Sequence, residues 1–365
     1  MPSNDAAWLP AAGARLEMKP APYTPPRENE IVVKNHAVAI NPMDWIVQTA
    51  GDMVFSWIKC PFILGSDAAG EVVEVGKSVT RFCVGDRVLG HAIGTDRERN
   101  CSAEGSFQTY TVLLERLTAH IPDDMSYERA SVLPLGMSTA ACGLFQKDFL
   151  ALEPPTVSPR PNGKTLLVWG GSTSVGSNAI QLAVAAGYDV IATASPKNFD
   201  YVRKLGASQA FDYNDTNAVR DVIAALKGKT IAGAIAIGTG SSEACVNIVG
   251  ACEGNKFVAM ATYPISFEGQ TGRPGLGFRL ATVRQFLGFS IALWIRARVK
   301  GAGTKFIFGS ALAHNEVGTV VYVDFLSKAL ACGTIPCRSG STRRRKRSRV
   351  NPSRTRHATS RRVSR

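Results

Sequence analysis

The chain has 365 residues, of which 45% are hydrophobic, so it is long enough for about two domains with substantial cores. Its formal net charge of +13 is concentrated at the end. Residues 338–365 hold 12 of the 42 Lys and Arg and no Asp or Glu, which leaves 30 basic against 29 acidic residues before them. The body of the chain therefore gives no indication of a nucleic-acid-binding surface.

Cysteine usage and the apolar stretches indicate a cytoplasmic protein. Eight cysteines are scattered without a C-x-x-C pair, which is typical of reduced thiols. The N-terminus lacks a basic segment followed by an apolar one, so we expect no secretory signal. Leu276–Trp294 is apolar but contains Arg279 and Arg284, and it falls short of the uninterrupted apolar length of about 20 residues that a membrane span needs. We therefore expect no membrane partner.

The first third of the chain predicts β-structure. Its apolar stretches are short and are separated by glycine-containing turns, a pattern that indicates a small barrel or sandwich. The expected strands are Glu30–Ile40, Ala69–Val75, Phe82–Leu89 and Gly105–Leu114. Helices are expected from Ser126 and over Ser138–Phe145, followed by a proline-rich loop at Leu152–Gly163.

The stretch Lys164–Ala183 combines a buried strand, a glycine turn and an amphipathic helix. The first N–H groups of such a helix are unpaired and, with the helix dipole, suit a diphosphate. The spacing Gly170-x-x-Thr173-x-x-Gly176 departs from the G-x-G-x-x-G fingerprint, because a threonine stands where a glycine is usual. The alternative is an ordinary strand-to-helix turn.

Strands and helices then alternate on short loops, which predicts a parallel, doubly wound α/β sheet. This context favours nucleotide binding at the glycine turn. The expected elements are strand Asp189–Ala194, helix Asn198–Leu205, strand Gln209–Asp212, helix Asn217–Leu226, strand Ala232–Ile237, helix Glu243–Val249, strand Lys256–Ala261 and a late helix at Val320–Leu330.

The end of the second strand indicates which nucleotide binds. NAD-dependent folds usually carry an Asp or Glu about 20 residues after the glycine turn, where it binds the ribose hydroxyls. The segment Thr193–Asn198 contains no acid and offers the Ser195 hydroxyl, the Lys197 cation and the Asn198 amide. These groups suit a 2′-phosphate, so we predict NADPH. The alternative is that Lys197 is only a solvated lysine.

Five blocks of sequence, in order, resemble the medium-chain dehydrogenase/reductase superfamily. They are NPMDW at 41–45, PFILGSDAAGEVVEVG at 61–76, VGDRV at 84–88, GSFQTY at 105–110 and LPLGMSTA at 133–140. The likeness runs from about Ala7 to Ile335. Within it the chain resembles the zinc-independent quinone-oxidoreductase branch, in particular fungal alcohol-dehydrogenase-like proteins and trans-acting enoyl reductases of polyketide pathways.

The resemblance implies a GroES-like β-rich catalytic domain and a Rossmann cofactor domain. We place the first part of the catalytic domain at 1–130, the NADPH-binding domain at 131–300, a return segment at 301–337 and a basic tail at 338–365. It also implies which residues contact the cofactor, although core packing is the alternative for Tyr213 and Met260. The implied residues are Asn41, Pro42, Met43, Asp44, Thr139, Gly171, Ser172, Thr173, Ser174, Val175, Gly176, Ser195, Pro196, Lys197, Asn198, Tyr213, Gly238, Thr239, Met260 and Ala261.

We expect no bound zinc. Zinc-dependent members of this superfamily hold the catalytic metal with a Cys, a His-Glu pair and a distal Cys or Asp. The matching positions here are Asp44 and Ser66-Asp67, which include no imidazole or thiol. His36, His91 and His120 are expected to be core or surface residues rather than ligands.

Without zinc, the site lacks a metal that could polarise an alcohol or a carbonyl group. Conjugate reduction needs less electrophilic help, so it is the favoured reaction. We predict hydride transfer from NADPH to the β-carbon of an enone, enoyl thioester or quinone, in secondary metabolism. Two alternatives are a zinc-independent alcohol dehydrogenase or carbonyl reductase, and a catalytically impaired cofactor-binding relative. Candidate catalytic residues are Asp44, Tyr110 and Thr139. Relatives often carry a lysine at the position of Ile46, so Asp44, Tyr110 and solvent are the candidate proton donors, and we predict that water protonates the α-carbon.

The expected partner is a small-molecule substrate, including the case of a carrier-bound polyketide, and the expected assembly is a monomer or a homodimer. The tail 338–365 has no apolar periodicity and is expected to be a disordered extension. The alternative for its Arg343–Arg347 run is a nucleic-acid-binding or nuclear-import segment.

Overall fold

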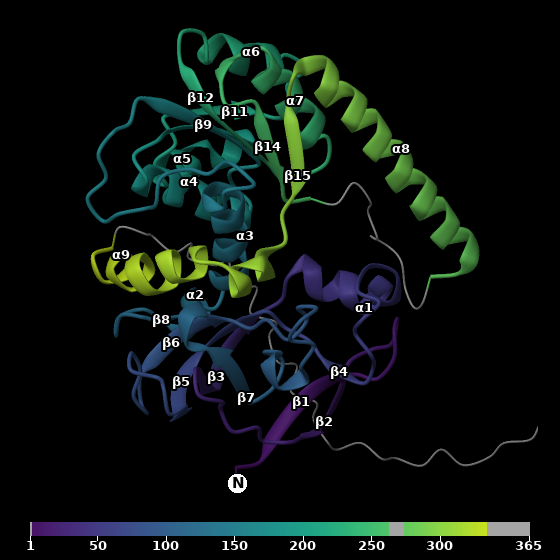
Figure 1. The fold of residues 1–365 in the computed structure, drawn as a ribbon, viewed down its shortest axis with the longest axis vertical. Coiled ribbons are helices and arrows are strands. Elements are labelled where there is room, and N and C mark those ends of the chain that lie inside the picture. The colour runs from purple at the N-terminus through teal and green to yellow at the C-terminus, as the bar shows by residue number, and fades with distance from the viewer. Residues whose placement is uncertain (1, 263–273, 334–365) are drawn as a thin grey trace, which may run out of the picture.

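The computed structural model describes residues 2–262 and 274–333. A β-rich part lies below a parallel sheet covered by helices in Figure 1. Helix α1 (Pro42–Val54) and helix α9 (Ser327–Ala331) lie between the two parts. The fold class predicted from the sequence is confirmed.

The β-rich part contains two antiparallel sheets, in the orders β7-β3-β5-β6-β8 and β2-β1-β4. Alternate apolar side chains of the larger sheet, among them Ile31, Val33 and Val88, are buried in one cluster, as the period-2 pattern predicts. A short helix α2 (Tyr127–Ala130) follows. The strands are β1 (Asn4–Leu9), β2 (Glu17–Ala21), β3 (Glu30–Ala39), β4 (Phe62–Ile63), β5 (Asp67–Val75), β6 (Arg87–His91), β7 (Tyr110–Leu114) and β8 (Thr118–His120).

The second part is built on a parallel sheet in the order β11-β10-β9-β12-β14-β15, with β13 paired to β12. Its strands are β9 (Lys164–Trp169), β10 (Asp189–Ala194), β11 (Gln209–Asp212), β12 (Thr230–Ala236), β13 (Glu253–Gly254), β14 (Phe257–Met260) and β15 (Gly303–Phe306). Its helices are α3 (Pro134–Phe145), α4 (Ser174–Ala185), α5 (Phe199–Lys204), α6 (Ala218–Ala225), α7 (Ser241–Gly250) and α8 (Leu276–Lys300). Numbered along the main path, the strand order is 3-2-1-4-5-6, in which the direction of winding reverses between β9 and β12.

Helices cover both faces of this sheet. Leu166 and Val168 of β9 pack into one core cluster with side chains of α3 and α4. Leu167 and Trp169 pack into a second cluster with side chains of α6, α7 and α8. The strand is therefore buried on both faces, which explains why it reads as a continuous apolar run.

The structure corrects several predicted boundaries. The strand predicted over Phe82–Leu89 begins later, at Arg87. The residues before it form a turn through Gly85, in which the Cys83 N–H donates to Asp86 Oδ2 (2.8 Å). The strand predicted over Gly105–Leu114 begins at Tyr110, because the N–H groups of Ser106 and Phe107 donate to the carbonyls of Gly65 and Leu64 (3.0 and 2.9 Å). The late helix begins as a π-helix, Thr319–Leu326, before α9.

Strand β15 was not predicted. It pairs in parallel with β14, Val258 facing Thr304, so the boundary placed at residue 300 falls one strand too early. The chain then returns to the β-rich part, where Arg116 Nη1 donates to the Asn315 carbonyl (3.2 Å) and the His120 N–H donates to Ser327 Oγ (3.2 Å).

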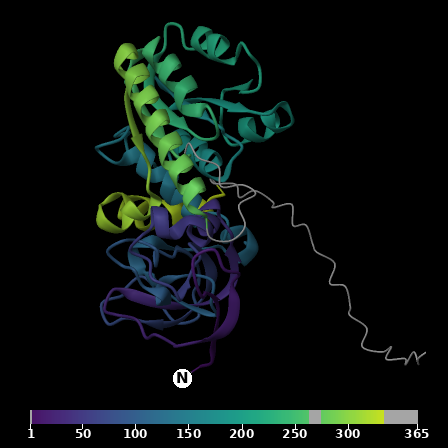
Figure 2. The same ribbon diagram turned by 90° about the vertical axis from the view of Figure 1, so that its right-hand side faces the viewer.

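The basic tail predicted at 338–365 lies outside the described residues, as do residues 334–337 of the predicted return segment. None of the helices within 2–262 and 274–333 combines the length and the apolar character needed to cross a bilayer. Helix α8 instead runs along the outside of the molecule, and Figure 2 views it from the front.

Candidate active site

The predicted cofactor residues of the second part meet at one edge of the parallel sheet. The strand ends lie in register: Trp169 pairs with Ala236, Ala236 with Met260, and Ala194 with Asp212. The turns that follow these strands therefore share one edge, at the reversal between β9 and β12 where open α/β sheets bind ligands. They begin at Gly170, Ser195, Tyr213, Ile237 and Ala261.

The glycine turn requires its glycines. Gly170 has φ +85°, and a Cβ there would lie 2.5 Å from the Ile237 carbonyl oxygen. A Cβ on Gly176 would lie 2.2 Å from the carbonyl oxygen of Gly170 and 2.9 Å from the Cα of Gly171. These contacts show that α4 can begin this close to β9 only if position 176 has no side chain.

Thr173 caps helix α4 rather than obstructing the turn. Its Oγ1 accepts from the Gly176 N–H (3.0 Å) and donates to the Gly170 carbonyl (2.8 Å). Within the described ranges, the N–H groups of Ser172, Ser174 and Val175 have no protein acceptor. The turn thus offers free donors at a helix N-terminus, which fits a diphosphate.

The segment after β10 presents polar groups without an acid. Asn198 Nδ2 donates to Ser195 Oγ (3.1 Å), and the Lys197 side chain is exposed. The neighbouring strand ends in Asp212, whose Oδ1 already accepts from the backbone and side-chain nitrogens of Asn214 (both 3.0 Å). The arrangement suits an anionic group more than a pair of ribose hydroxyls.

The remaining predicted contacts differ in exposure. Tyr213 is 44% exposed, so this side chain does not pack in the core. Met260 is half-buried and packs against a core cluster. Gly238 and Thr239 are exposed, and the Gly238 N–H donates to Thr262 Oγ1 (2.7 Å).

Two buried carboxyls connect helix α1, strand β5 and helix α3. Asp44 Oδ2 accepts from the Asn41 N–H (2.8 Å), and Asp67 accepts from Asn41 Nδ2 (2.9 Å) and the Leu135 N–H (2.6 Å). Burial raises the pKa of Asp44 to about 6 and that of Asp67 to about 7, because each loses hydration of its charged form. Through its hydrogen bond with the Asn41 N–H, Asp44 caps the N-terminus of α1.

Of the other two predicted catalytic residues, one lies at the junction between the parts and one does not. Thr139 is half-buried on α3, where its Oγ1 donates to the Leu135 carbonyl (2.8 Å) and lies close to Gly309. Tyr110 packs edge-on against Tyr23, with ring centroids 5.3 Å apart. The structure does not bring Tyr110 to the cavity described next.

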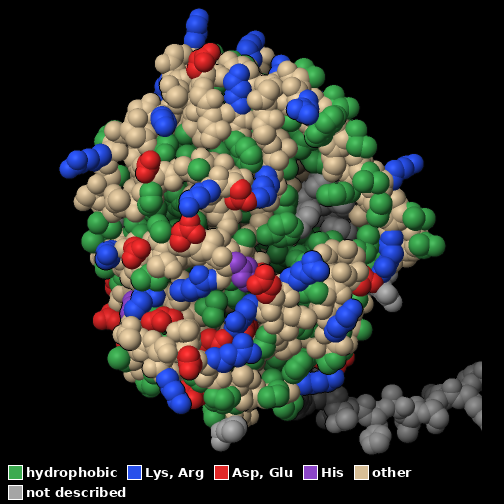
Figure 3. All heavy atoms as spheres, viewed as in Figure 1, with side chains coloured by type: hydrophobic (Ala, Val, Ile, Leu, Met, Phe, Trp, Pro, Cys, Tyr) green, Lys and Arg blue, Asp and Glu red, His purple; other side chains and the backbone are tan. Residues whose placement is uncertain are grey.

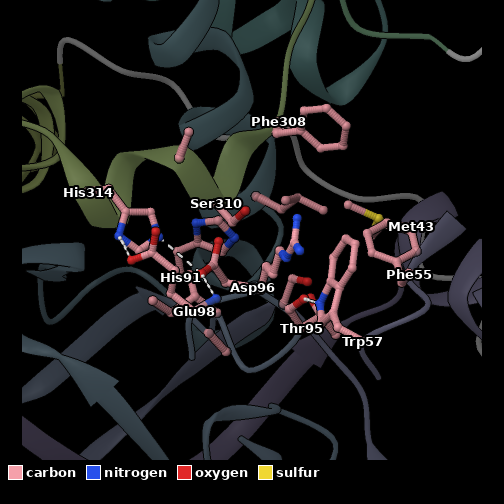
Figure 4. A pocket seen from close by; sticks show the side chains of 16 residues that line it. Met43, Phe55, Trp57, His91, Thr95, Asp96, Glu98, Phe308, Ser310 and His314 are labelled. Atoms are coloured by element: carbon pink, nitrogen blue, oxygen red, sulfur yellow. Dashed lines mark hydrogen bonds and ion pairs between the residues drawn. The ribbon is translucent and has the colours of Figure 1, made fainter. Parts of the chain in front are cut away.

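A cavity of about 310 Å³ lies between the two parts (Figure 4). Phe308, just after β15, and Leu135 of α3 bound it from the side of the parallel sheet. Met43, Phe55 and Trp57 give it an apolar wall, and the Trp57 indole N–H is held by the Thr95 carbonyl (3.0 Å). This composition suits a largely apolar substrate.

The polar wall of this cavity was not predicted from the sequence. His314 Nε2 lies 3.0 Å from Asp96 Oδ1, and its Nδ1 lies 3.2 Å from Glu98 Oε2 (Figure 4). Both ring nitrogens of His314 therefore face carboxylate oxygens. His314 and Asp96 are 218 positions apart, and no local pattern links them.

His91 also lines the cavity and was assigned to the core or surface. It is 2% exposed, and burial lowers its pKa to about 4, so the ring is neutral at pH 7. Its Nδ1 is a buried atom without a hydrogen-bond partner among the residues the structure describes. A neutral imidazole carries one N–H, which can donate one hydrogen bond.

The residues at the positions that match the zinc ligands of zinc-dependent members do not fit that metal. Asp44, Ser66 and Asp67 supply only oxygen atoms, and both carboxyls already accept hydrogen bonds from Asn41 and Leu135. Over the two described ranges, no three or more His, Cys, Asp or Glu side chains are grouped as metal ligands would be.

Family models match both parts of the chain. An alcohol dehydrogenase GroES-like domain matches residues 27–123, and a zinc-binding dehydrogenase domain matches residues 174–259.

Individual proteins match over most of the chain. Dehydrogenase pigH of Monascus ruber is 55% identical, over 91% of this chain and 90% of the relative. Trans-enoyl reductase himH of Aspergillus japonicus is 38% identical, over 90% and 86%. Among solved structures, an alcohol dehydrogenase superfamily protein from Novosphingobium aromaticivorans has a TM-score of 0.66 at 25% identity, covering 91% of this chain and 88% of its own. Escherichia coli quinone oxidoreductase complexed with NADPH has a TM-score of 0.61 at 19% identity, covering 92% and 90%.

Proposed function

The chain belongs to the medium-chain dehydrogenase/reductase superfamily, and from that premise we propose that it is an NADPH-dependent reductase of conjugated carbon–carbon double bonds. The substrate class is an enone, an enoyl thioester or a quinone. The observation that carries the proposal is the cavity between Met43 of α1 and Phe308 at the end of the sheet. It is apolar on one side, carries two histidines on the other, and adjoins the edge where the strand ends meet.

The cofactor-binding groups fit NADPH. The free N–H groups at Ser172, Ser174 and Val175 would hold the diphosphate, and Ser195, Lys197 and Asn198 would hold the 2′-phosphate. Tyr213 would cover the adenosine part, and Thr139 would lie near the nicotinamide. When bound, the dihydronicotinamide supplies a hydride, that is, a proton with an electron pair.

The protein supplies the proton that completes the reduction. As the hydride adds to the β-carbon, charge develops on the carbonyl oxygen, where the neutral His91 would donate a hydrogen bond. A His314 ring N–H would then turn from its carboxylate partner, Asp96 or Glu98, toward the α-carbon and give its proton there. One hydride and one proton saturate the double bond, the cofactor is left oxidised, and His314 regains a proton from solvent. For this role we prefer His314 to Asp44, which caps α1, and to Tyr110, which lies outside the cavity.

We expect Lys197→Glu to raise the KM for NADPH by about tenfold or more and to leave the KM for NADH within about twofold, because the variant loses a charge-assisted contact to the 2′-phosphate and gains repulsion. Steady-state kinetics with each cofactor measure both values. Lys204→Glu is the matched control, since Lys204 is exposed on α5 and carries the same charge change. Equal effects of Lys197→Glu on NADPH and NADH contradict the 2′-phosphate assignment.

Product analysis tests the reaction class. We expect incubation with NADPH and a panel of enones, enoyl thioesters and quinones to give saturated or hydroquinone products with the thioester or ketone carbonyl intact. An allylic alcohol as the main product identifies a carbonyl reductase instead. NADPH bound with fluorescence quenching, but oxidised by no member of the panel, identifies a cofactor-binding relative without this activity.

A further inference from the structure

Helix α8 exposes an apolar face that the enzyme activity does not use. Its 25 residues correspond to a length of about 37 Å. Leu280, Leu287, Ile291 and Trp294 are between 54% and 63% exposed and recur at spacings of three, four and seven. In Figure 3 apolar side chains gather along the margin of the molecule over α8, with Lys and Arg side chains among them. Exposed apolar surface of this extent on one element marks an interaction site.

The core-facing side of α8 is a different one. Thr282, Leu293 and Ala297 are buried, and the last two pack with the core cluster beneath the sheet. At 100° per residue, Leu293 points about 160° away from Ile291. The exposed face is thus a second apolar face, on the side opposite the one that packs against the protein.

The charge of α8 indicates what kind of partner its exposed face can bind. The helix contains four Arg and one Lys and no Asp or Glu. Arg279 pairs with Asp52, and Arg296 Nη1 donates to Asn247 Oδ1 (3.3 Å). Arg284 and Arg298 stand on the exposed face and pair with no carboxylate in the part of the chain that the structure describes; Arg298 lies over the Trp294 ring, 5.6 Å from its centroid. The exposed face is therefore apolar and cationic.

A second copy of this chain is a poor occupant, because the same face would bring Arg284 and Arg298 against their equivalents. An anionic lipid surface complements both properties: apolar side chains enter the headgroup boundary while arginines reach the phosphates. We propose that α8 binds flat on an anionic lipid surface. The expectation of no membrane partner rested on the lack of a spanning segment, which an interfacial helix does not need.

The position of α8 relates this surface to the cavity. Its first turn is tied to the end of α1 through Arg279 and Asp52, and Phe55, three residues after Asp52, lines the apolar wall. A bilayer against α8 would lie beside that end of the cavity. An apolar substrate dissolved in lipid would then have a short path to the site. This last point rests on the proposed function, whereas lipid binding by α8 does not.

Sedimentation of the full chain with vesicles tests the proposal. We expect binding to phosphatidylcholine vesicles containing about one third phosphatidylserine, and at least about tenfold weaker binding to phosphatidylcholine alone. The double variant Leu287→Glu, Ile291→Glu is expected to lose about tenfold or more of the anionic-vesicle binding. Val84→Glu is the control, because Val84 is 65% exposed on a turn of the other part. Cofactor fluorescence quenching checks that the variants stay folded.

A second readout locates the contact. Vesicles with brominated acyl chains are expected to quench tryptophan fluorescence of the full chain, and Trp294→Phe is expected to remove most of that quenching. Binding that is unchanged in the double variant, or quenching that is unchanged in Trp294→Phe, overturns the proposal and assigns any lipid affinity to other basic segments. A dimer that the double variant dissociates also overturns it and makes this face a contact between copies.

Discussion

Replacement of Gly176 by alanine is expected to weaken NADPH binding by about 100-fold or more. The new Cβ would lie 2.2 Å from a backbone carbonyl oxygen, so β9 and α4 must move apart. Overpacking of this kind costs about 1–3 kcal/mol, and about 2.7 kcal/mol corresponds to 100-fold in affinity. Separation of the strand from the helix also moves the free N–H groups away from the diphosphate. Fluorescence titration of the variant with NADPH measures the loss.

Gly288→Ala is the control for this experiment. Gly288 lies within a helix, and a Cβ there meets nothing within 4 Å. We expect its NADPH affinity to equal that of the unmodified protein. A Gly176→Ala variant that binds NADPH within about twofold of the unmodified protein, with the same circular dichroism, contradicts the placement of the diphosphate at this turn.

The second large effect is expected from His314→Gln. The amide keeps a hydrogen-bonding group beside Asp96 and Glu98, but its N–H protons are too weakly acidic to be transferred, so kcat should fall about 100-fold. NADPH affinity should stay the same, because His314 lies in the return segment beyond the strand-end turns that would hold the cofactor. Protonation then limits the rate of the variant. The solvent deuterium isotope effect on kcat should therefore rise, and the isotope effect on kcat measured with cofactor deuterated at the transferring position should fall.

His36→Gln is the matched histidine control, since His36 is exposed and stacks on Tyr127 with ring centroids 4.6 Å apart. We expect its kcat to match that of the unmodified protein. If His314→Gln also retains kcat within about twofold, water supplies the proton and the carboxylate-held histidine has only a structural role.

The parallel sheet could be predicted because its information is local. A strand such as Leu166–Trp169 is buried on both faces, so its apolar run is visible in the sequence, and each helix follows on a short loop. Strand β15, with the sequence GTKF, has no apolar run and is identified only by its pairing with β14. The cofactor edge followed from the strand ends once the alternation was recognised.

The cavity could not be predicted in the same way. Its histidines and carboxylates come from β6, the loop after it and the return segment, and only the folded chain brings Asp96 to His314. Tyr110 shows the converse, because it belongs to a block that resembles the superfamily, yet it packs against Tyr23 and does not line this cavity. The sequence shows that helix α8 is apolar and basic. Which of its two apolar faces packs against α7, and which is exposed, is seen only in the folded chain.

Single-turnover reduction with NADPH deuterated at the transferring position of C4 tests the central claim most directly. The protein is mixed with the labelled cofactor and an enone or an enoyl thioester of N-acetylcysteamine, and the product is examined by mass spectrometry and NMR. We predict one deuterium at the β-carbon, one solvent proton at the α-carbon and an intact carbonyl. Deuterium on the carbonyl carbon with the double bond retained, or no label transferred to any substrate of the panel, would contradict conjugate reduction in this cavity.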